Sequence, residues 1–323
     1  MVPTILVTGG AGYIGSLTSQ MLVQQGYRVV ILDKLVYQGS FQPSWATFVQ
    51  ADYADRAALT KVFQEHRVTA VMHFAGYIEV GESVAQPLKF YANNVAQTIT
   101  LLETMKAHGV RNIIFSSSCA VYGKPQVVPI PEDHGVHPLS PYGRTKLIIE
   151  QMLGDVHRTQ DLHYVTLRYF NAAGAVPEQG IGERHIPETH LIPLVIQAAQ
   201  QQRPVDIFGA DYGTRDGTCV RDYLHILDIA RAHLLALQHL EAGKPSDTFN
   251  LGTGHGYTVK EVVECVERVS NTPLKVLLKD RRPGDSPQLI ADAAKAHSIL
   301  GWKPQFSDLE YIVRSAFVFA QQG

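Results

Sequence analysis

Tyr142 and Lys146 lie four residues apart in the segment SPYGRTK, residues 140–146. Ser140 followed by Pro141 is a typical helix start, with the serine as N-cap and the proline in the first turn. Four residues of α-helix turn through about 400° and rise about 6 Å, so we expect the phenol and the ammonium on the same face. A surface Tyr–Lys pair has the same spacing, so the neighbouring residues must decide whether this pair is catalytic.

Three consecutive serines support a catalytic interpretation. Ser116, Ser117 and Ser118 end an apolar stretch that we predict to be a strand, and doubly wound sheets bind ligands at the carboxyl ends of their strands. A free tyrosine has a pKa of about 10, and one cation about 5 Å away lowers it by roughly two units. We therefore expect Lys146 and an oxidised nicotinamide ring to bring the pKa of the Tyr142 phenol near neutrality. Such a phenol is a general base for an alcohol, and Ser118 would hydrogen-bond the reacting oxygen.

A glycine-rich turn near the N-terminus indicates the cofactor. Gly9, Gly12 and Gly15 lie in VTGGAGYIG, between a predicted strand and a predicted helix. Glycines let the backbone approach a pyrophosphate, and the helix N-terminus offers free N–H groups and a positive dipole. A tight strand–helix turn without a ligand is the alternative interpretation.

Acidic residues close the next two predicted strands. Asp33 ends the second strand, where a carboxylate accepts hydrogen bonds from an adenosine ribose and repels a 2′-phosphate, so NAD is favoured over NADP. Lys34, its neighbour, weakens that preference slightly. Asp52 ends the third strand, and it either holds the adenine amino group or caps the following helix.

Short β-branched runs alternate with helical stretches in the first half of the chain. Strands that are apolar on both faces and separated by helices predict a doubly wound α/β domain with a parallel (Rossmann) sheet. The expected strands are 4–8, 28–33, 47–52, 70–76, 112–118 and 163–171, and the expected helices are 13–25, 55–66, 94–109 and one that begins at Tyr142.

The character of the sequence changes beyond about residue 172. A loop rich in Gly and Pro, 172–188, precedes short, isolated strands at 205–208, 248–252 and 275–278 and helices at 226–240 and 258–270. We therefore expect an NAD-binding domain over 1–171 and a smaller α/β domain over 172–323. The second domain is expected to bind mainly the substrate, and the chain can cross back from it to the first domain.

Composition excludes several classes of protein. The chain has 323 residues, a formal net charge of -2 and a pI of about 6.7, so we expect no nucleic acid and no anionic membrane as partner. The start MVPTILVTGG lacks the basic and apolar regions of a signal peptide, and no apolar run is long enough to span a membrane. Three widely spaced cysteines predict a reducing, cytoplasmic compartment, and the lack of HExxH and CxxC motifs predicts no metal site.

Ten short motifs stand in the order typical of one enzyme family: VTGGAGYIGS, HFAG, VGESV, NNV, FSSSCAVYG, SPYGRTK, LRYFNAAGA, DGTCVRDYLHILDIA, FNLGTG and RRPGD. With these motifs the chain resembles the extended short-chain dehydrogenase/reductase superfamily and, within it, the family of UDP-glucose 4-epimerases (UDP-galactose 4-epimerases). The resemblance covers nearly the whole chain. It implies reversible C4 epimerisation of UDP-glucose and UDP-galactose, by transient hydride transfer to tightly bound NAD through a 4-keto intermediate.

The resemblance also implies roles for individual residues. Tyr142 matches the catalytic base, Lys146 the electrostatic partner that also holds the nicotinamide ribose, and Ser118 the hydrogen-bonding helper. The implied cofactor-binding residues are Gly9, Gly12, Tyr13, Ile14, Gly15, Asp33, Asp52, Tyr53, Phe74, Ala75, Gly76, Asn93, Asn94, Ser116, Tyr142, Lys146, Tyr169 and Phe170. The resemblance also implies ten substrate-binding residues. Ser118 and Tyr142 would contact the reacting sugar oxygen. The diphosphate would be bound by Asn171, Arg221 and Arg282, the uracil by Phe208 and the uridine ribose by Asp285. The remaining residues are His190, Leu191 and Leu289.

Three positions are expected to change individual contacts with the sugar, the cofactor or the uracil. One position after the RRxGD motif gates the sugar C2 group in the family, and a tyrosine there restricts the pocket to hexoses. Aligning RRPGDSPQLIADA places Leu289 at this gate, which predicts weaker turnover of the N-acetyl sugars. Ile78 stands where many members carry Lys, and His190 stands where others carry Asn, so one cofactor contact and one uracil-side contact are expected to differ.

Other functions fit parts of the same pattern. A UDP-N-acetylglucosamine or UDP-pentose 4-epimerase would use the same chemistry. Nucleotide-sugar 4,6-dehydratases carry an acidic residue after the active-site Ser or Thr, where this chain has Cys119 and Ala120. A UDP-glucuronate decarboxylase would need a cation for the substrate carboxylate. A non-catalytic NAD(H)-sensing protein typically lacks the Tyr or the Lys.

The resemblance further suggests a homodimer. The apolar faces of segment 94–105 and of the helix after Tyr142 would form a helix bundle between two subunits. The same faces could equally pack within one subunit.

Overall fold

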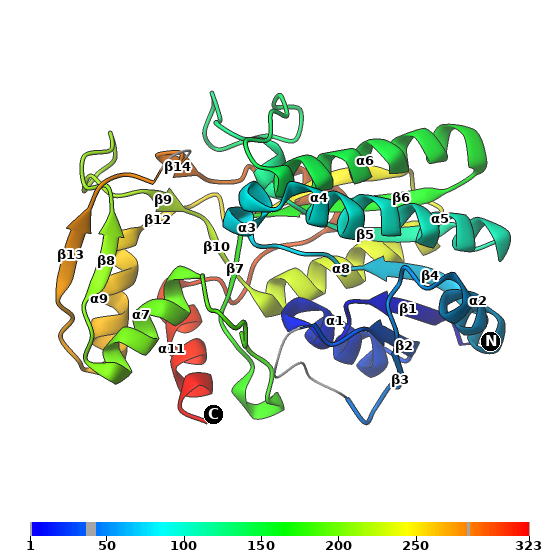
Figure 1. The fold of residues 1–323 in the computed structure, drawn as a ribbon, viewed down its shortest axis with the longest axis horizontal. Helices are drawn as coiled ribbons and strands as arrows, with labels where there is room; N and C mark the ends of the chain where they lie inside the picture. The colour runs from blue at the N-terminus through cyan, green and yellow to red at the C-terminus, as the bar shows by residue number, and fades with distance from the viewer. Residues whose placement is uncertain (1, 37–42, 283–284, 323) are drawn as a thin grey trace.

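Seven parallel strands form the main sheet of the computed structural model, which describes residues 2–36, 43–282 and 285–322 (Figure 1). Their order is β11-β6-β5-β4-β1-β2-β3, and each strand runs parallel to its neighbours. This is the strand order of a Rossmann sheet with one strand added, so the predicted doubly wound α/β fold is confirmed. The strands are β1 (Thr4–Thr8), β2 (Arg28–Asp33), β3 (Thr47–Gln50), β4 (Val68–His73), β5 (Asn112–Ser118), β6 (His163–Tyr169) and β11 (Asp247–Leu251).

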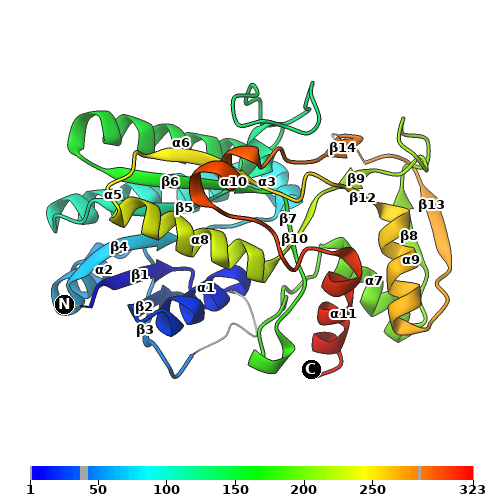
Figure 2. The ribbon, with the colours of Figure 1, turned by 180° about the vertical axis from the view of Figure 1, so that it is seen from behind.

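Helices cover both faces of this sheet because its strands are apolar on both faces. Successive side chains of a strand point to opposite faces. Leu6 and Phe115 pack toward one layer of helices, while their neighbours Val7 and Ile114 pack toward the other. One layer consists of α2 (Arg56–His66), α5 (Gln97–Ala107) and α6 (Pro141–Gln160), and the other of α1 (Tyr13–Gln24), α8 (Ile226–Glu241) and α10 (Ala294–Leu300), as Figures 1 and 2 show from opposite sides.

The segment TFNLG, residues 248–252, differs from its prediction. We expected an isolated strand of the second domain, but the segment forms most of β11, which pairs with β6 at the edge of the main sheet. The pairing buries Phe249 and Leu251 completely, which explains why a strand so far along the chain returns to the first domain. The boundary after residue 171 therefore does not separate the main sheet from all later residues, and the domain division remains a prediction.

The remaining elements form a smaller group of helices and strands at the left of Figure 1. Its core consists of side chains from three mutually packed helices and from short strands of two small sheets beside them. These helices are α7 (Leu191–Gln201), α9 (Val259–Ser270) and α11 (Leu309–Ala320), and the strands are β8 (Val205–Phe208) with β13 (Val276–Lys279), β7 (Asn171–Ala173) with β10 (Tyr223–His225), and β9 (Val220–Arg221) between β12 (Tyr257–Thr258) and β14 (Gln288–Leu289).

Local details confirm some predicted boundaries and change others. The Ser140 hydroxyl accepts from the N–H of Gly143 at 3.1 Å and caps α6, as predicted. The helix expected over 94–109 instead begins as a π-helix, Tyr91–Ala96, before α5. Short helices complete the chain: α3 (Val80–Ala85), α4 (Pro87–Phe90) and the 3₁₀ turns Cys119–Val121 and Pro177–Gln179.

The described ranges contain neither a membrane-spanning helix nor a cluster of metal-ligating side chains. No helix there is long and apolar enough to cross a membrane. No group of three or more His, Cys, Asp or Glu side chains there is placed to hold a metal ion.

Candidate active site

A cavity of about 540 Å³ lies at the carboxyl ends of β1, β2, β4 and β5. The strand order reverses between β1 and β4, because β2 lies on one side of β1 while the later strands β4 and β5 lie on the other. Doubly wound sheets leave a crevice at this switch point. The cavity is lined by side chains from both parts of the molecule, so it can hold a ligand that reaches from the sheet to the smaller part.

The glycine turn forms one wall of the cavity and has the geometry of a phosphate site. Gly9 has a φ of +73°, and an added Cβ there would lie 2.6 Å from the backbone nitrogen of Ala75. Gly12 is the N-cap of α1, and no side chain accepts a hydrogen bond from the first helical N–H groups. An added Cβ on Gly12 would meet only the Gly9 carbonyl oxygen, at 3.3 Å. These N–H groups are therefore available for a pyrophosphate.

Asp33 lines the same cavity, at the end of β2. Its carboxylate accepts from the N–H of Ala11 at 3.0 Å and of Leu35 at 2.8 Å. Burial raises the pKa of Asp33, and these hydrogen bonds partly offset that increase. The fixed carboxylate and the free helix N-terminus together fit an adenosine-containing dinucleotide.

Lys34 lines the cavity next to Asp33, and its amine is paired with two other side chains. Its amine donates to Asp52 at 3.0 Å and to the side chain of Asn93 at 2.9 Å. Asp52 does not line the cavity, and the N-cap of α2 is Asp55, so the alternative prediction of Asp52 as a helix cap was wrong. We expected Lys34 to weaken the preference for NAD over NADP, and its ion pair with Asp52 reduces this effect.

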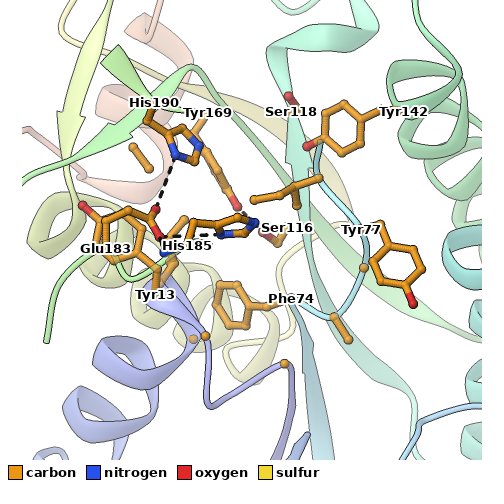
Figure 3. Close-up of a pocket in the computed structure, with 18 of the residues that line it drawn as sticks. Tyr13, Phe74, Tyr77, Ser116, Ser118, Tyr142, Tyr169, Glu183, His185 and His190 are labelled. Atoms are coloured by element: carbon orange, nitrogen blue, oxygen red, sulfur yellow. Dashed lines mark hydrogen bonds and ion pairs between the residues drawn. The ribbon is translucent and has the colours of Figure 1, made fainter. Parts of the chain in front are cut away.

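Tyr142 and Ser118 point toward one another in the cavity (Figure 3). Tyr142 comes from the first turn of α6, and Ser118 ends β5, so a helix start and a strand end bring the two hydroxyl groups together. Burial raises the pKa of the Tyr142 phenol above its ordinary value, and a side-chain hydrogen bond with Ser118 acts in the opposite direction. The expected near-neutral phenol also requires the positive charge of the oxidised nicotinamide ring, so it remains a prediction.

Lys146 lies behind the phenol. Its amine donates to the Ser116 carbonyl at 2.8 Å and lies 5.9 Å from the centre of the Tyr142 ring. Burial lowers the pKa of Lys146 to about 8, while the charge of Glu150 raises it. The expected Tyr–Lys arrangement on one helix face is therefore present.

The structure brings most of the predicted site residues into one cavity. Those that line it are Gly9, Gly12, Tyr13, Ile14, Gly15, Asp33, Tyr53, Phe74, Ala75, Gly76, Asn93, Ser116, Ser118, Tyr142, Tyr169, Phe170, Asn171, His190, Arg221, Asp285 and Leu289. Those that do not line it are Asp52, Asn94, Lys146, Leu191, Phe208 and Arg282. The binding roles of both groups of residues remain predictions.

Two of the residues outside the lining have other contacts. Asn94 is buried, and its amide donates to the Tyr77 carbonyl at 3.0 Å and to Thr145 at 3.1 Å, so it connects the loop after β4 to α6. The guanidinium of Arg282 lies 3.8 Å from the centre of the Phe208 ring. Pro283 and Gly284 of the RRPGD motif lie outside the described residues.

Sequence reasoning missed a cluster of charged side chains in the loop before α7 (Figure 3). His185 lines the cavity, and its imidazole is 2.8 Å from the carboxylate of Glu79 and 3.7 Å from that of Glu183. Although burial lowers the pKa of His185, the two carboxylates raise it to about 9. The sequence GERH places two of these residues together, but only the fold brings Glu79 to them.

The fold and the site define the class of protein. The chain belongs to the NAD dependent epimerase/dehydratase family, whose model matches residues 5–252. It is 51% identical over 315 residues to the UDP-glucose 4-epimerase of Rhizobium leguminosarum bv. trifolii, which covers 97% of this chain and 96% of that protein. The family resemblance predicted from the motifs is confirmed.

Solved structures agree with the sequence relatives. The UDP-glucose 4-epimerase of Brucella ovis in complex with NAD superposes with a TM-score of 0.94 at 45% identity, over 98% of each chain. The UDP-Glc/GlcNAc 4-epimerase of Campylobacter jejuni gives 0.86 at 40% identity, over 99% of this chain and 100% of that chain.

Proposed function

We propose that the protein interconverts UDP-glucose and UDP-galactose by inverting C4 of the hexose with NAD as a resident cofactor. The observation that carries the proposal is the pair of Tyr142 and Ser118 hydroxyl groups in the same cavity as the glycine turn. The similarity to UDP-glucose 4-epimerases along nearly the whole chain supports it.

The residues of the chain divide the work. Tyr142 takes the proton of the sugar 4-hydroxyl and later returns it, and Ser118 hydrogen-bonds the same oxygen. When bound, NAD accepts a hydride from C4 and gives it back to the opposite face of the sugar. Arg221, which lines the cavity, binds the diphosphate, so the nucleotide is held while the 4-keto sugar turns.

Arg221 is positioned for such a role by the backbone around it. Its guanidinium donates to the carbonyls of Val220 and Ser286 at 2.9 Å each and lies 3.4 Å from the Asp285 carboxylate. These contacts join β9 to the segment before β14, so the arginine is held in place before substrate binds.

The decisive experiment is turnover of purified protein with UDP-galactose, UDP-N-acetylgalactosamine and UDP-arabinose in separate reactions, with each 4-epimer identified by chromatography. We expect UDP-glucose from the first reaction. Formation of a 4-keto-6-deoxy sugar or of a pentose with release of carbon dioxide would show a dehydratase or a decarboxylase instead. Absence of any product with bound NAD retained would favour a sensing protein.

The residues after Ser118 argue against a dehydratase. Such an enzyme needs an acidic group there to expel the 6-hydroxyl, but Cys119 and Ala120 occupy these positions. Burial raises the pKa of the Cys119 thiol to about 12, so this thiol is not an acid catalyst at neutral pH.

Cofactor preference gives a direct test of Asp33. We expect the protein to bind NAD at least about 100-fold more tightly than NADP, because a carboxylate close to a 2′-phosphate repels it and Lys34 is occupied by Asp52. In calorimetric titrations, Asp33→Ala should reduce the ratio of NAD affinity to NADP affinity to about tenfold or less. Asp55→Asn, which changes only a helix cap, should leave this ratio unchanged. Equal affinities in the wild type would contradict the assignment.

Leu289 gives a test of sugar selectivity. It lines the cavity beside a buried cluster that includes Phe170 and Tyr122. Fitting an acetamido group against this leucine should cost about 1–3 kcal/mol, which is roughly a 5- to 150-fold lower kcat/KM for the N-acetyl pair. Leu289→Tyr should abolish N-acetyl turnover and preserve turnover of UDP-galactose. Equal turnover of both pairs by the wild type, or an unchanged ratio in the variant, would refute the gate.

We also propose a homodimer in the cytoplasm. Exposed apolar side chains on α3, α4 and α5 support the dimer: Val84 is 64% exposed, Leu88 80% and Ile99 45%. Most apolar residues of α5 and α6 pack on their own sheet instead, so a bundle would use the outer faces of these helices. The three cysteines are unpaired, which suits a reducing compartment.

A further inference from the structure

A buried ion pair lies directly behind the catalytic residues. Glu150 follows Lys146 by about one turn of α6. Arg168 of β6 donates to its carboxylate at 2.5, 3.0 and 3.2 Å, and the hydroxyl of Ser117 donates at 2.5 Å. The Arg168 side chain is 9% exposed and the Glu150 side chain 7%, so water solvates neither charge.

This ion pair joins the elements that carry the reacting groups. Glu150 is on the helix of Tyr142, and Ser117 is the residue before Ser118 on β5. Glu150 therefore connects α6 to β5, the two elements whose ends place the catalytic hydroxyl groups side by side. Through Arg168 it also connects α6 to β6, the next strand of the sheet.

The network continues away from the cavity through three of the sequence motifs. Arg168 donates to the Tyr122 hydroxyl at 3.0 Å and to the Glu132 carbonyl at 3.3 Å, and the Tyr122 hydroxyl donates to Asn250 at 2.6 Å. Arg168 belongs to LRYF, Tyr122 to AVYG and Asn250 to FNLG. The proposed reaction assigns no role to these residues, and their hydrogen bonds fix Arg168 on the side opposite Glu150.

Glu150 also acts on Lys146 through its charge. The groups that face the Lys146 amine are Glu150 and Tyr142 from α6, the Ser116 carbonyl and the Phe115 ring from β5, and His73 from β4. Burial lowers the pKa of His73 to about 3, so this imidazole is neutral. Burial also lowers the pKa of Lys146, and Glu150 opposes that change. Among the described groups around Lys146, Glu150 supplies the full negative charge.

We propose that Glu150 is a positioning residue for the epimerase reaction: its hydrogen bonds with Arg168 and Ser117 align Ser118 with Tyr142, and its carboxylate lies one turn of α6 beyond Lys146. The inference rests on the proposed function. A purely structural ion pair would stabilise the fold without a directed effect on Lys146, so the titration of Lys146 separates the two roles.

The experiment titrates Lys146 by NMR in NAD-loaded protein labelled with ¹³C at the lysine Cε, and Lys146→Arg identifies its resonance. We expect the titration midpoint in Glu150→Gln to fall by roughly one pH unit or more below that of the wild type, because a negative charge about one helical turn away has been removed. In Glu150→Asp, which keeps the charge, the midpoint should return at least halfway to the wild-type value. Glu310→Gln, an exposed carboxylate paired with Arg314, should leave the midpoint unchanged.

The second measurement is kcat for UDP-galactose as a function of pH. The amine must be charged to support the phenolate, so its contribution is present below its pKa and is lost as pH rises through it. The alkaline limb of Glu150→Gln should therefore move to lower pH by the same amount as the midpoint, with KM unchanged. If Glu150→Gln does not fold, Arg168→Met is compared with Arg168→Met combined with Glu150→Gln; the two differ only in the charge of residue 150, and the double variant is expected to have the lower midpoint.

The outcomes are distinguishable. A midpoint equal to the wild type in every folded Glu150 variant would overturn the inference, however much the variants lose in Tm. A shifted midpoint in a protein whose wild type turns over no UDP-sugar would refute the proposed function and retain the effect of Glu150 on Lys146.

Discussion

Tyr142→Phe should lower kcat for UDP-galactose by at least about 100-fold, the usual scale for a positioned general base. The phenol oxygen is the atom that accepts the proton of the sugar 4-hydroxyl, and phenylalanine lacks it. The side chain is only 9% exposed, and phenylalanine fills nearly the same volume, so the fold and the bound cofactor should be retained.

Three measurements check this prediction: initial rates, NAD content after denaturation, and Tm. Tyr27→Phe is the matched control, because the Tyr27 hydroxyl donates to Glu241 at 2.7 Å and does not line the cavity. A Tyr142→Phe enzyme within threefold of the wild-type kcat would refute the role of the phenol. If Tyr142→Phe has a lower NAD content or a lower Tm than the wild type, its inactivity would be explained by structural damage instead of by the missing hydroxyl group.

Gly15→Ala should abolish cofactor retention. An added Cβ at Gly15 would lie 2.3 Å from the carbonyl oxygen of Gly9 and 3.0 Å from the Cα of Gly10, and these are backbone atoms that cannot move aside alone. The turn must open, which displaces the N–H groups at the start of α1. We expect NAD affinity to fall by at least about 100-fold, with a loss of about 1–3 kcal/mol in the free energy of unfolding, the range for overpacking.

Gly81→Ala is the control for this substitution. Gly81 lies in α3, where no atom lies within 4 Å of an added Cβ, and alanine favours helix by up to about 1 kcal/mol over glycine. Calorimetric titration with NAD and chemical denaturation should show no loss for Gly81→Ala. Wild-type NAD affinity in Gly15→Ala would mean that the glycine turn does not form the phosphate site.

The sequence predicted the sheet well because local and global signals agree there. The segment 28–33 has four apolar residues, three of them β-branched, and ends in the cavity-lining carboxylate of Asp33; it forms β2 with the expected bounds. The start of α6 was equally clear, because Ser140 and Pro141 each favour a helix N-terminus for a separate physical reason. Side chains that follow directly from such ends, including Ser118 and Tyr142, were placed correctly in one cavity.

Interactions between distant segments could not be read in the same way. The TFNLG segment has the pattern of any short buried strand, and nothing in that pattern specifies β6 as its partner. The contacts of Asn94 with Tyr77 and Thr145 could not be predicted either, because an asparagine side chain satisfies backbone and ligand groups equally well; its role at the cofactor remains a prediction. Burial of the Tyr142 phenol, which raises its pKa, follows from the packing of α6 on the sheet and could not be predicted from the Tyr–Lys spacing.

The position of β11 has a consequence for synthesis of the protein on the ribosome. β6 is complete at residue 169, but its outer neighbour begins at residue 247. During the seconds in which segment 170–246 is made, the N–H and C=O groups on the outer side of β6 have no partner strand. An unpaired strand edge of this kind is a template for other nascent chains on the same polysome. Chaperone binding to the unfinished chain, followed by release once residue 251 has emerged, would protect this edge until the sheet closes.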